Sequence, residues 1–282
     1  MFRNIKILDL VLFSFFLFVL IAVFLPGPGS NNIMGTLFTV ASFLFGIIIA
    51  FSINNSIGRF NKIVEALKAD EAHLLNLYRL SDCFDQKVKE KIKKLIDEYL
   101  IAQIDYYLID YKYSNKKFFE LADFITGLKP KNSHQEIVYE KMLDATSELA
   151  LNRKQVEVNL SLSMVPFEWV CVLTLLAIIL FCIFYSNNGQ TVMVVTSVLM
   201  STAAVILALI LRDLDNLIWK ESYWIWENLN QLFEEMNLLP YYPKGVLVSG
   251  RAKISRGQKV RVAIYPNPYP NFEGKIIKEF EV

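Results

Sequence analysis

Four long apolar runs, separated by segments that carry charge or short polar links, divide this chain. The runs are Leu10–Leu25, Ile33–Ile53, Phe167–Tyr185 and Thr191–Leu211. A helix needs about 20 apolar residues to cross about 30 Å of hydrocarbon, and each run approaches or reaches that length. The pattern therefore predicts four transmembrane helices.

The first run is the shortest, and it reaches full length only when Ile7 and Leu8 are added, with Asp9 near the interface. A secretory signal peptide is the alternative interpretation of such an N-terminal segment. The run is long for a signal peptide, and residues 23–25 offer no small-residue cleavage site. We therefore expect the segment to be retained as a membrane span.

The distribution of charge predicts the orientation of these spans. The two short links, 26–32 and 186–190, contain no charged residue. All 29 Lys and Arg residues lie in the N-terminal tail, in residues 54–166 or in the tail from Arg212. Because basic residues near spans favour the cytoplasm, we expect two helical hairpins in the plasma (inner) membrane. Both termini of this multi-pass protein are then cytoplasmic.

Beyond the second run, apolar residues recur every three or four positions from Ile63 onward, which predicts amphipathic helices. Breaks are expected at residues 81–85 and 129–133, and Ser133 with Glu136 matches a capping box. A long helix should then lead into the third span at Pro166. A further helical stripe follows the fourth span: Trp219, Tyr223, Trp226, Leu229, Phe233 and Met236. We expect Trp219 at the membrane interface and Trp226 in a helix-packing core.

The tail from Pro240 is rich in Pro and Gly and contains short alternating pieces, residues 259–265 and 275–282. These predict two or three short strands or extended segments that dock on the helices, because so few strands are not stable alone. The predicted fold is an all-α membrane protein with four transmembrane helices in two hairpins, long cytoplasmic helices and a short extended or β-like C-terminal tail. The expected segments are a first transmembrane hairpin (1–54), a cytoplasmic helical region (55–165), a second transmembrane hairpin (166–212), a cytoplasmic amphipathic helix (213–239) and the tail (240–282).

Catalytic and metal-site motifs are missing from the sequence. It has no P-loop, no G-x-G-x-x-G after a strand, no H-E-x-x-H and no G-x-S-x-G. Its three cysteines are not closely paired, and His73 and His134 lie on separate predicted helices. A net charge of +1 indicates no nucleic-acid partner. We therefore expect no enzymatic activity, no cofactor and no metal site.

The interiors of the spans lack charged residues and carry rows of small residues. Asp9 and Glu168 lie at span edges, which argues against proton-coupled transport. The candidate functional residues are Thr39, Ser42, Gly46 and Ala50 in the second span; the fourth span has a similar row, Ser197, Ser201, Ala204 and Ala208. Such rows usually let helices pack closely. The alternative is the lining of a narrow pore that gates by apolar constriction or selects weakly through hydroxyls and dipoles.

Several short segments within residues 35–243 resemble one known family. They are Phe45–Ser52, Arg59–Phe60, Glu71, Leu77–Arg79, Glu98–Tyr99, Leu211–Asp215 and Leu239–Pro243. With the layout of two hairpins around a helical inner region, they resemble the bestrophin-like membrane proteins, especially their poorly characterised prokaryotic branch. The resemblance implies a pentameric anion channel. It also implies a calcium clasp of acids after the last span, where this chain has only Asp213 and Asp215.

Taken together, these patterns predict an oligomeric channel-like membrane protein that passes anions or small solutes. The alternative is a non-conducting membrane scaffold or sensor whose cytoplasmic helices bind a protein partner. A pore requires the second-span row to face a central axis, whereas a scaffold can bury that row between helices of one subunit. The expected partners are the lipid bilayer and further copies of the chain in a homo-oligomer.

Overall fold

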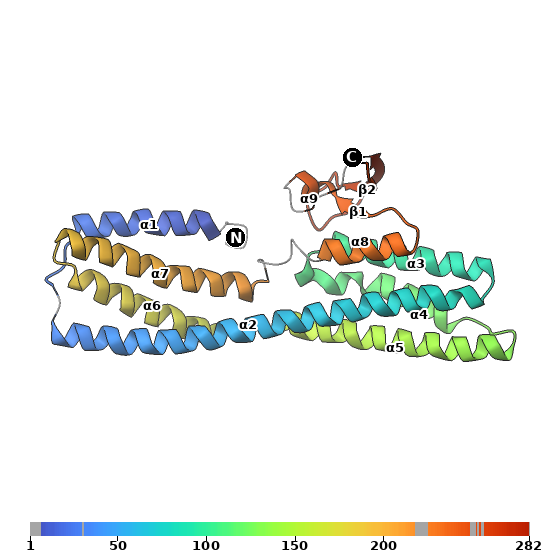
Figure 1. Ribbon diagram of the computed structural model, residues 1–282, viewed down its shortest axis with the longest axis horizontal. Coiled ribbons are helices and arrows are strands. Elements are labelled where there is room, and N and C mark those ends of the chain that lie inside the picture. The colour runs from blue at the N-terminus through green and yellow to red at the C-terminus, as the bar shows by residue number, and fades with distance from the viewer. Residues whose placement is uncertain are drawn as a thin grey trace. The chain divides into compact units, whose positions relative to one another are not determined.

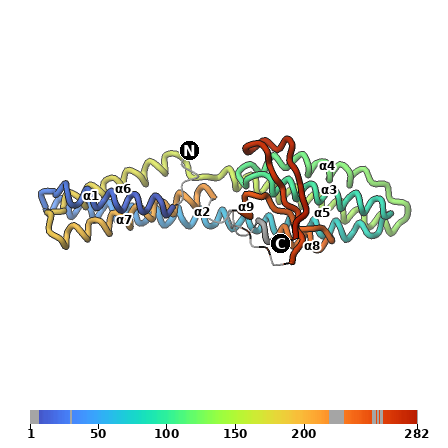
Figure 2. The backbone as a smooth tube through the Cα atoms, turned by 90° about the horizontal axis from the view of Figure 1, so that it is seen from above, coloured from blue at the N-terminus to red at the C-terminus, as the bar shows by residue number. Residues whose placement is uncertain are grey.

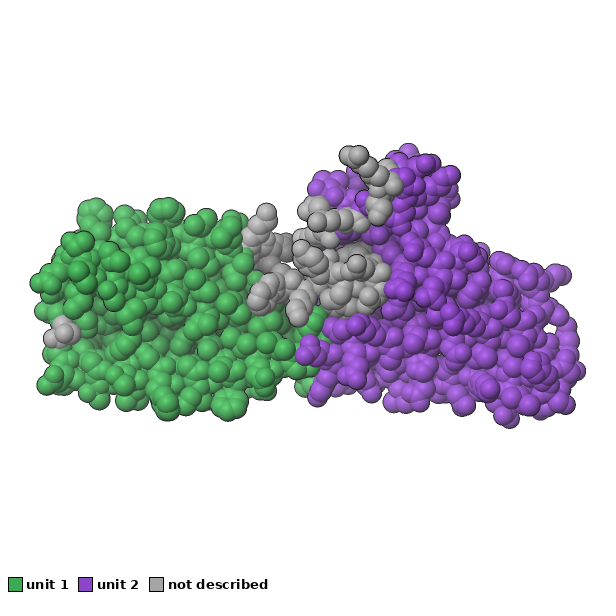
Figure 3. All heavy atoms as spheres, viewed as in Figure 1, with its two compact units in different colours: residues 1–60, 162–219 green, residues 61–161, 220–282 purple. Residues whose placement is uncertain are grey.

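The computed structural model describes residues 7–29, 31–217, 225–248, 252, 254 and 257–281, without the side chains of 225–228. The chain is mostly helical and divides into two compact units, drawn in different colours in Figure 3. One unit comprises residues 1–60 and 162–219, and the other comprises residues 61–161 and 220–282. They are called here the membrane unit and the helical unit.

The membrane unit contains α1 (Ile7–Phe24), the first part of α2 (Asn32–Leu80), α6 (Pro166–Ser186) and α7 (Thr191–Asp215). Helix α7 lies beside both α1 and α6 (Figures 1 and 2). The described chain has four helical segments long and apolar enough to cross a membrane, as the sequence predicts. Their shared core is apolar: it joins Phe45 and Ile49 of α2 to Val172 and Ile179 of α6 and Leu211 of α7.

The two short links at one end of this unit are in direct contact. The backbone N–H of Gly27 donates to the carbonyl of Asn187 at 2.6 Å, and the Asn187 amide donates to the carbonyl of Ala22 at 2.7 Å. A Cβ at Gly27 would lie 2.3 Å from the carbonyl oxygen of Tyr185. The backbones can therefore approach this closely only because residue 27 has no side chain.

Helix α2 is continuous over 49 residues. The sequence predicted a span ending at Ile53 and amphipathic periodicity from Ile63, without assigning the residues between. No proline interrupts this stretch, and its glycine, Gly58, has open space where a Cβ would lie. A single glycine costs a helix about 1 kcal/mol relative to alanine, which neighbouring turns readily offset.

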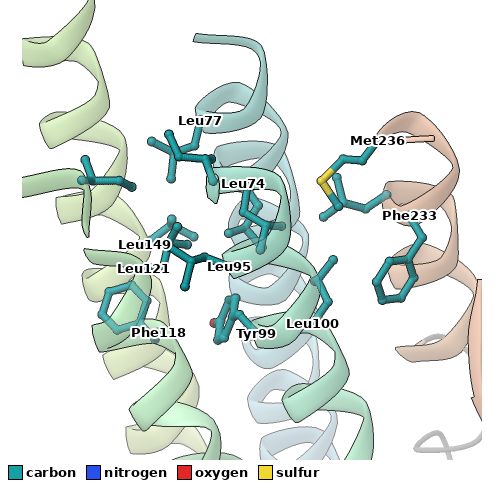
Figure 4. Packing of buried hydrophobic residues seen from close by; sticks show 14 of the residues in the cluster. Leu74, Leu77, Leu95, Tyr99, Leu100, Phe118, Leu121, Leu149, Phe233 and Met236 are labelled. Carbon is teal, nitrogen blue, oxygen red and sulfur yellow. The ribbon is translucent and has the colours of Figure 1, made fainter. Parts of the chain in front are cut away.

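The helical unit combines the rest of α2 with six further helical elements. They are η2 (Ser81–Cys83), α3 (Gln86–Asp105), η3 (Leu108–Ser114), α4 (Asn115–Thr126), α5 (Ser133–Ser161) and α8 (Ile225–Glu235). Their apolar faces meet in one core, where Leu74, Tyr99, Leu121 and Phe233 are at most 1% exposed (Figure 4). The predicted stripe that begins at Ile63 therefore forms a buried helix face, as its periodicity indicates.

The breaks fall where the sequence predicts them, but one cap differs. Asn132, and not Ser133, caps α5: its Oδ1 accepts the backbone N–H of Gln135 at 2.9 Å. The N-cap is therefore shifted by one residue, since an asparagine satisfies the free N–H groups of a first turn equally well, and the Gln135 side chain accepts the backbone N–H of Lys131 at 2.9 Å. Helix α5 ends at Ser161, and the non-helical residues 162–165 separate it from Pro166.

The C-terminal tail forms a three-stranded sheet with the order β1-β2-β3. Strand β1 (Tyr241–Pro243) pairs in parallel with β2 (Lys259–Ile264), which pairs antiparallel with β3 (Ile276–Glu281); the short helix α9 (Lys244–Val248) follows β1. The sheet docks on α3 through polar contacts. The guanidinium of Arg261 donates hydrogen bonds to both carboxylate oxygens of Asp97, at 2.8 and 2.9 Å. The carboxylate of Asp105 accepts hydrogen bonds from the hydroxyls of Tyr241 and Tyr265, each at 2.6 Å.

Part of the stripe predicted after the fourth span lies on α8 and at its end. Phe233 and Met236 are fully buried in the core of the helical unit. Trp219 and Tyr223 lie outside the described residues, and so does the side chain of Trp226. The boundaries expected for the five segments of the chain remain predictions.

Candidate functional site

Within the membrane unit, helix α2 packs along one narrow face. Ala41, Phe45 and Ile49, which are four positions apart, are 3–4% exposed and contact the α6 and α7 core. Positions spaced by four residues lie on one side of a helix. The remaining sides of α2 are therefore available to something other than this chain's own helices.

The predicted row of small residues lies outside that packed face. Thr39, Gly46 and Ala50 are exposed, and Ser42 is partly exposed. Among the described residues, no atom outside its own helix turn lies within 4 Å of a Cβ placed at Gly46. The hydroxyl of Thr39 donates to the carbonyl of Gly35 at 2.8 Å, so its hydrogen is used within the helix. The row therefore forms a surface of small side chains with few unused hydrogen-bond donors.

A second exposed row on α2 consists of large apolar residues. Its members recur every three or four positions and are 39–67% exposed: Leu37, Val40, Leu44, Ile47 and Phe51. The exposed part of α2 therefore has two different flanks, one of small residues and one of large apolar residues.

The corresponding row on α7 behaves in the opposite way. Ser197, Ser201 and Ala208 are at most 8% exposed, and Ala204 packs against the same core as Ala208. Small residues let helix backbones approach closely in a membrane, where no hydrophobic effect drives helices together. The row on α7 therefore has the packing role, whereas the row on α2 is largely exposed among the residues that the structure describes.

A buried ion pair joins the ends of the membrane unit's helices. Arg59 on α2 is 7% exposed, and its guanidinium lies 3.3 Å from Oδ1 of Asp215, the last residue of α7. Its two terminal nitrogens also donate to the carbonyl oxygens of Leu162 and Asp215. One side chain thus ties α2 both to the end of α7 and to the link that follows α5.

The carboxylate of Asp215 completes this junction, because each of its oxygens has a further donor. Oδ1 accepts the backbone N–H of Met164 at 2.9 Å, and Oδ2 accepts the indole N–H of Trp169 on α6 at 3.2 Å. Charge-assisted hydrogen bonds of this kind are about twice as strong as neutral ones. The junction of Arg59 and Asp215 therefore fixes three helices and one link at a single buried point.

Comparison with known proteins agrees with this architecture. A family model described as a bestrophin-like domain matches residues 9–217, which is more than half of the chain. The chain belongs to the bestrophin-like family. None of the curated proteins matches the sequence.

Solved structures show the same fold for this bestrophin-like protein at low sequence identity. A mutant of a bacterial bestrophin homologue from Klebsiella pneumoniae has a TM-score of 0.66 at 13% identity, covering 80% of this chain and 97% of that chain. Another structure of a bacterial bestrophin homologue from Klebsiella pneumoniae has a TM-score of 0.62 at 12% identity, covering 83% and 100%. A third structure, described as a membrane protein, has a TM-score of 0.64 at 13% identity, covering 81% and 99%.

The two acids of this bestrophin-like protein that stand near the calcium clasp implied by the resemblance do not fit such a site. Calcium takes six to eight oxygen ligands. The carboxylate of Asp215 already accepts hydrogen bonds from Arg59, Met164 and Trp169. Asp213 accepts the guanidinium of its neighbour Arg212 at 2.8 Å. Among the described residues, no group of three or more His, Cys, Asp and Glu side chains is placed to hold a metal ion.

Sequence reasoning did not predict that Arg59 and Asp215 form a pair, although both lie in segments that carry the family resemblance. The available signal was their position. Arg59 lies 18 residues, or five helical turns, after Ala41 on α2, so a charge occupies the packed side of the helix. A charge on a packed helix face needs a partner, because isolated buried charges are costly.

Proposed function

We propose that the chain is one subunit of a homo-oligomeric channel in the plasma membrane that passes anions or small solutes along a path lined by α2. The single observation that carries the proposal is the exposed part of α2. In a channel-like family, an exposed row of small residues is a surface that can face a path or a neighbouring subunit.

The two flanks of α2 support an arrangement of several copies around an axis. A contact between two different surfaces generates a ring when its rotation closes. In our proposal the row Thr39, Ser42, Gly46 and Ala50 lines the path. The row of large apolar residues contacts the neighbouring copy.

The residues that follow the span support a preference for anions. Asn54 and Asn55 are exposed, and side-chain amides donate hydrogen bonds to anions. Because Arg59 is buried against Asp215, the first charged residue after the span with an exposed side chain is Lys62, which is basic, and the first acid is Glu65. An apolar segment with no ring of charges would gate by dewetting and select weakly between anions.

Substituting Gly46 tests the lining role. Gly46→Leu should leave folding and assembly intact, because the structure has room for a side chain there. Flux should fall by about tenfold or more, because added apolar bulk narrows and dewets a pore. The measurement combines size-exclusion chromatography of the purified protein with anion flux into liposomes. Ser42→Ala should keep assembly and change the ratio of fluxes between anions.

Two controls make this experiment decisive. Ala177→Leu adds the same bulk at an exposed position on α6 and should not change flux. Ala208→Leu adds it at a buried position on α7 and should destabilise the subunit by about 1–3 kcal/mol through overpacking. If the assembled wild-type protein passes no anion, with or without calcium, the scaffold or sensor function stands in its place.

The proposed orientation places both termini and the helical unit in the cytoplasm, as the charge distribution predicts. In a background without the native cysteines, Asn188→Cys should react with an impermeant thiol reagent added outside intact cells. Lys129→Cys should not react until the cells are opened. Both positions are exposed. Lys129 is chosen instead of the nearby Asn132, because replacing Asn132 would remove the cap of α5. Labelling of Lys129→Cys from outside would contradict the orientation.

A further inference from the structure

A buried acid and a buried base occupy the core of the helical unit, away from the residues assigned to the path. Asp70 on α2 is 2% exposed, and Arg153 on α5 is 3% exposed. Neither forms a direct ion pair with the other in the structure, because two tyrosine hydroxyls stand between them. Burying both charges is costly unless each of their polar atoms has a hydrogen-bond partner.

The hydroxyls of Tyr99 on α3 and Tyr111 on η3 bridge the two charges. They donate to Oδ2 of Asp70 at 3.3 and 3.1 Å. Both oxygens accept from the guanidinium of Arg153, and both accept from the amide of Gln103, at 2.7 Å for Tyr99 and 3.2 Å for Tyr111. Each hydroxyl therefore gives its single hydrogen to Asp70, and the oxygen of the other tyrosine, 3.5 Å away, is a second acceptor within reach.

Arg153 is held on all sides and is not free to move toward Asp70. Its second terminal nitrogen donates to Ser114, at 3.0 Å, and to the side-chain oxygen of Asn115. Its guanidinium carbon lies 4.5–5.1 Å from the centres of the Tyr99, Tyr111 and Phe118 rings. Cation–π contacts at this range stabilise a desolvated cation. The base is thus fixed, and the acid is the member of the pair that can change its state.

One oxygen of Asp70 remains without a partner. Oδ1 has no hydrogen bond among the described residues, and neither has Nδ2 of the neighbouring Asn152, which is 8% exposed. Oδ2 already accepts two hydroxyl hydrogens, so it is the less basic oxygen. A proton taken up by this carboxyl would therefore bind to Oδ1, whose lone pairs are not used by any hydrogen bond among the described residues.

The electrostatic surroundings agree with reversible protonation. Burial, the largest effect, raises the pKa of Asp70 from 3.8 to about 7, against the opposing effects of the Arg153 charge and of the hydrogen bonds from Tyr111 and Tyr99. A carboxyl whose pKa is higher in the folded than in the unfolded state stabilises the fold most at low pH. That contribution is lost as the pH rises from about 4 through about 7.

We propose that Asp70 is a proton switch: its carboxyl binds and releases a proton at Oδ1, and the two forms hold α2 against α3, η3 and α5 with different strength. In one form the cluster is neutral, with Asp70 and Arg153 both charged. In the other it carries the single positive charge of Arg153. Because α2 continues from this cluster into the segment assigned to the path, proton binding also controls flux; this second step rests on the proposed function.

The titration of a second acid, Glu71, must be distinguished from that of Asp70 in any test. Glu71, the next residue of α2, is half-buried, and partial burial followed by the charge of Glu235 on α8 raises its pKa to about 7 as well, against the effect of Lys68. The groups that face Asp70 itself are Arg153 and Asn152 from α5, Tyr99 from α3 and Tyr111 from η3. Glu71→Gln therefore serves as one control.

The direct experiment is infrared difference spectroscopy of the purified full-length protein, titrated between about pH 6 and pH 8. In a protein that carries Glu71→Gln, we expect a protonated-carboxyl band that disappears as the pH rises and that is missing when Asp70→Asn is added. The band should persist when Asp144→Asn is added instead, which removes an exposed acid from α5. A band that survives the addition of Asp70→Asn, or a Glu71→Gln protein without a titrating band, would overturn the proposal.

A melting experiment reports the consequence for packing. The melting temperature of the wild type should fall, relative to that of Asp70→Asn, as the pH rises from about 4 to about 7, because only the wild type buries a carboxylate at the higher pH. The difference should persist when both proteins carry Glu71→Gln. Parallel melting curves at every pH would show that the two forms pack alike and would contradict the switch.

Flux into liposomes, measured on the same proteins, separates this inference from the channel proposal. The flux should change with pH at the same midpoint as the infrared band and become independent of pH in Asp70→Asn. Constant flux through a protein whose band titrates would refute the coupling of the switch to the path. If the assembled protein passes no anion while the band titrates at Asp70, the channel function fails and the proton site stands.

Discussion

Replacing Arg59 by methionine is expected to lower the free energy of unfolding of the membrane unit by about 3–5 kcal/mol, because it leaves a buried carboxylate without its cation. Asp215 would keep Met164 and Trp169 as donors, but the carbonyl oxygens of Leu162 and Asp215 would each lose a partner. The measurement is thermal and denaturant unfolding of the purified protein in detergent, followed by circular dichroism.

The chain supplies a matched control for this prediction. Arg79, also on α2, lies 3.3 Å from Glu235, the same separation as between Arg59 and Asp215, but these two side chains are 68% and 36% exposed. Arg79→Met should therefore cost at most about 1 kcal/mol, since solvent screens exposed pairs. Arg59→Lys should fall between the two, because a lysine keeps the charge without the fork of donors. Equal losses for Arg59→Met and Arg79→Met would show that burial does not strengthen the junction.

Arg153→Met should have a comparable effect on the helical unit, and that effect should depend on pH. At about pH 8 Asp70 is ionised, and removal of its cation should cost about 3–5 kcal/mol. At about pH 5 the carboxyl is protonated, so the cost should fall to that of the lost hydrogen bonds and ring contacts. Unfolding curves at the two pH values, recorded for wild type and variant, give the difference.

Two further variants identify the cause of this loss. Lys154→Met changes the neighbouring residue, whose side chain is 72% exposed, and should leave stability nearly unchanged. Adding Asp70→Asn to Arg153→Met removes the unpaired carboxylate and should recover most of the pH-dependent part. A loss in Arg153→Met that is the same at both pH values would mean that Asp70 does not carry the charge assigned to it.

The sequence by itself determines which segments are long and apolar enough to cross a membrane and where most of the other helices are interrupted. The four apolar runs appear as four helices, because the length and uninterrupted apolarity of each run favour no other state in a bilayer. The breaks at residues 81–85 and 129–133 are local, and the second contains both Pro130 and the capping residue Asn132. The tail strands follow from alternation and turn residues, which are also local signals.

Only the tertiary structure decided what each helix face does. The small-residue rows of α2 and α7 look alike in sequence, yet the row on α7 is buried and the row on α2 is exposed. Periodicity determines which residues share a face, but it does not determine which neighbour that face meets. Arg59 with Asp215, and Asp70 with Arg153, become partners only when segments 156 and 83 positions apart are folded together. Their positions on packed helix faces signal that a partner exists, and the packing of the other helices decides which residue it is.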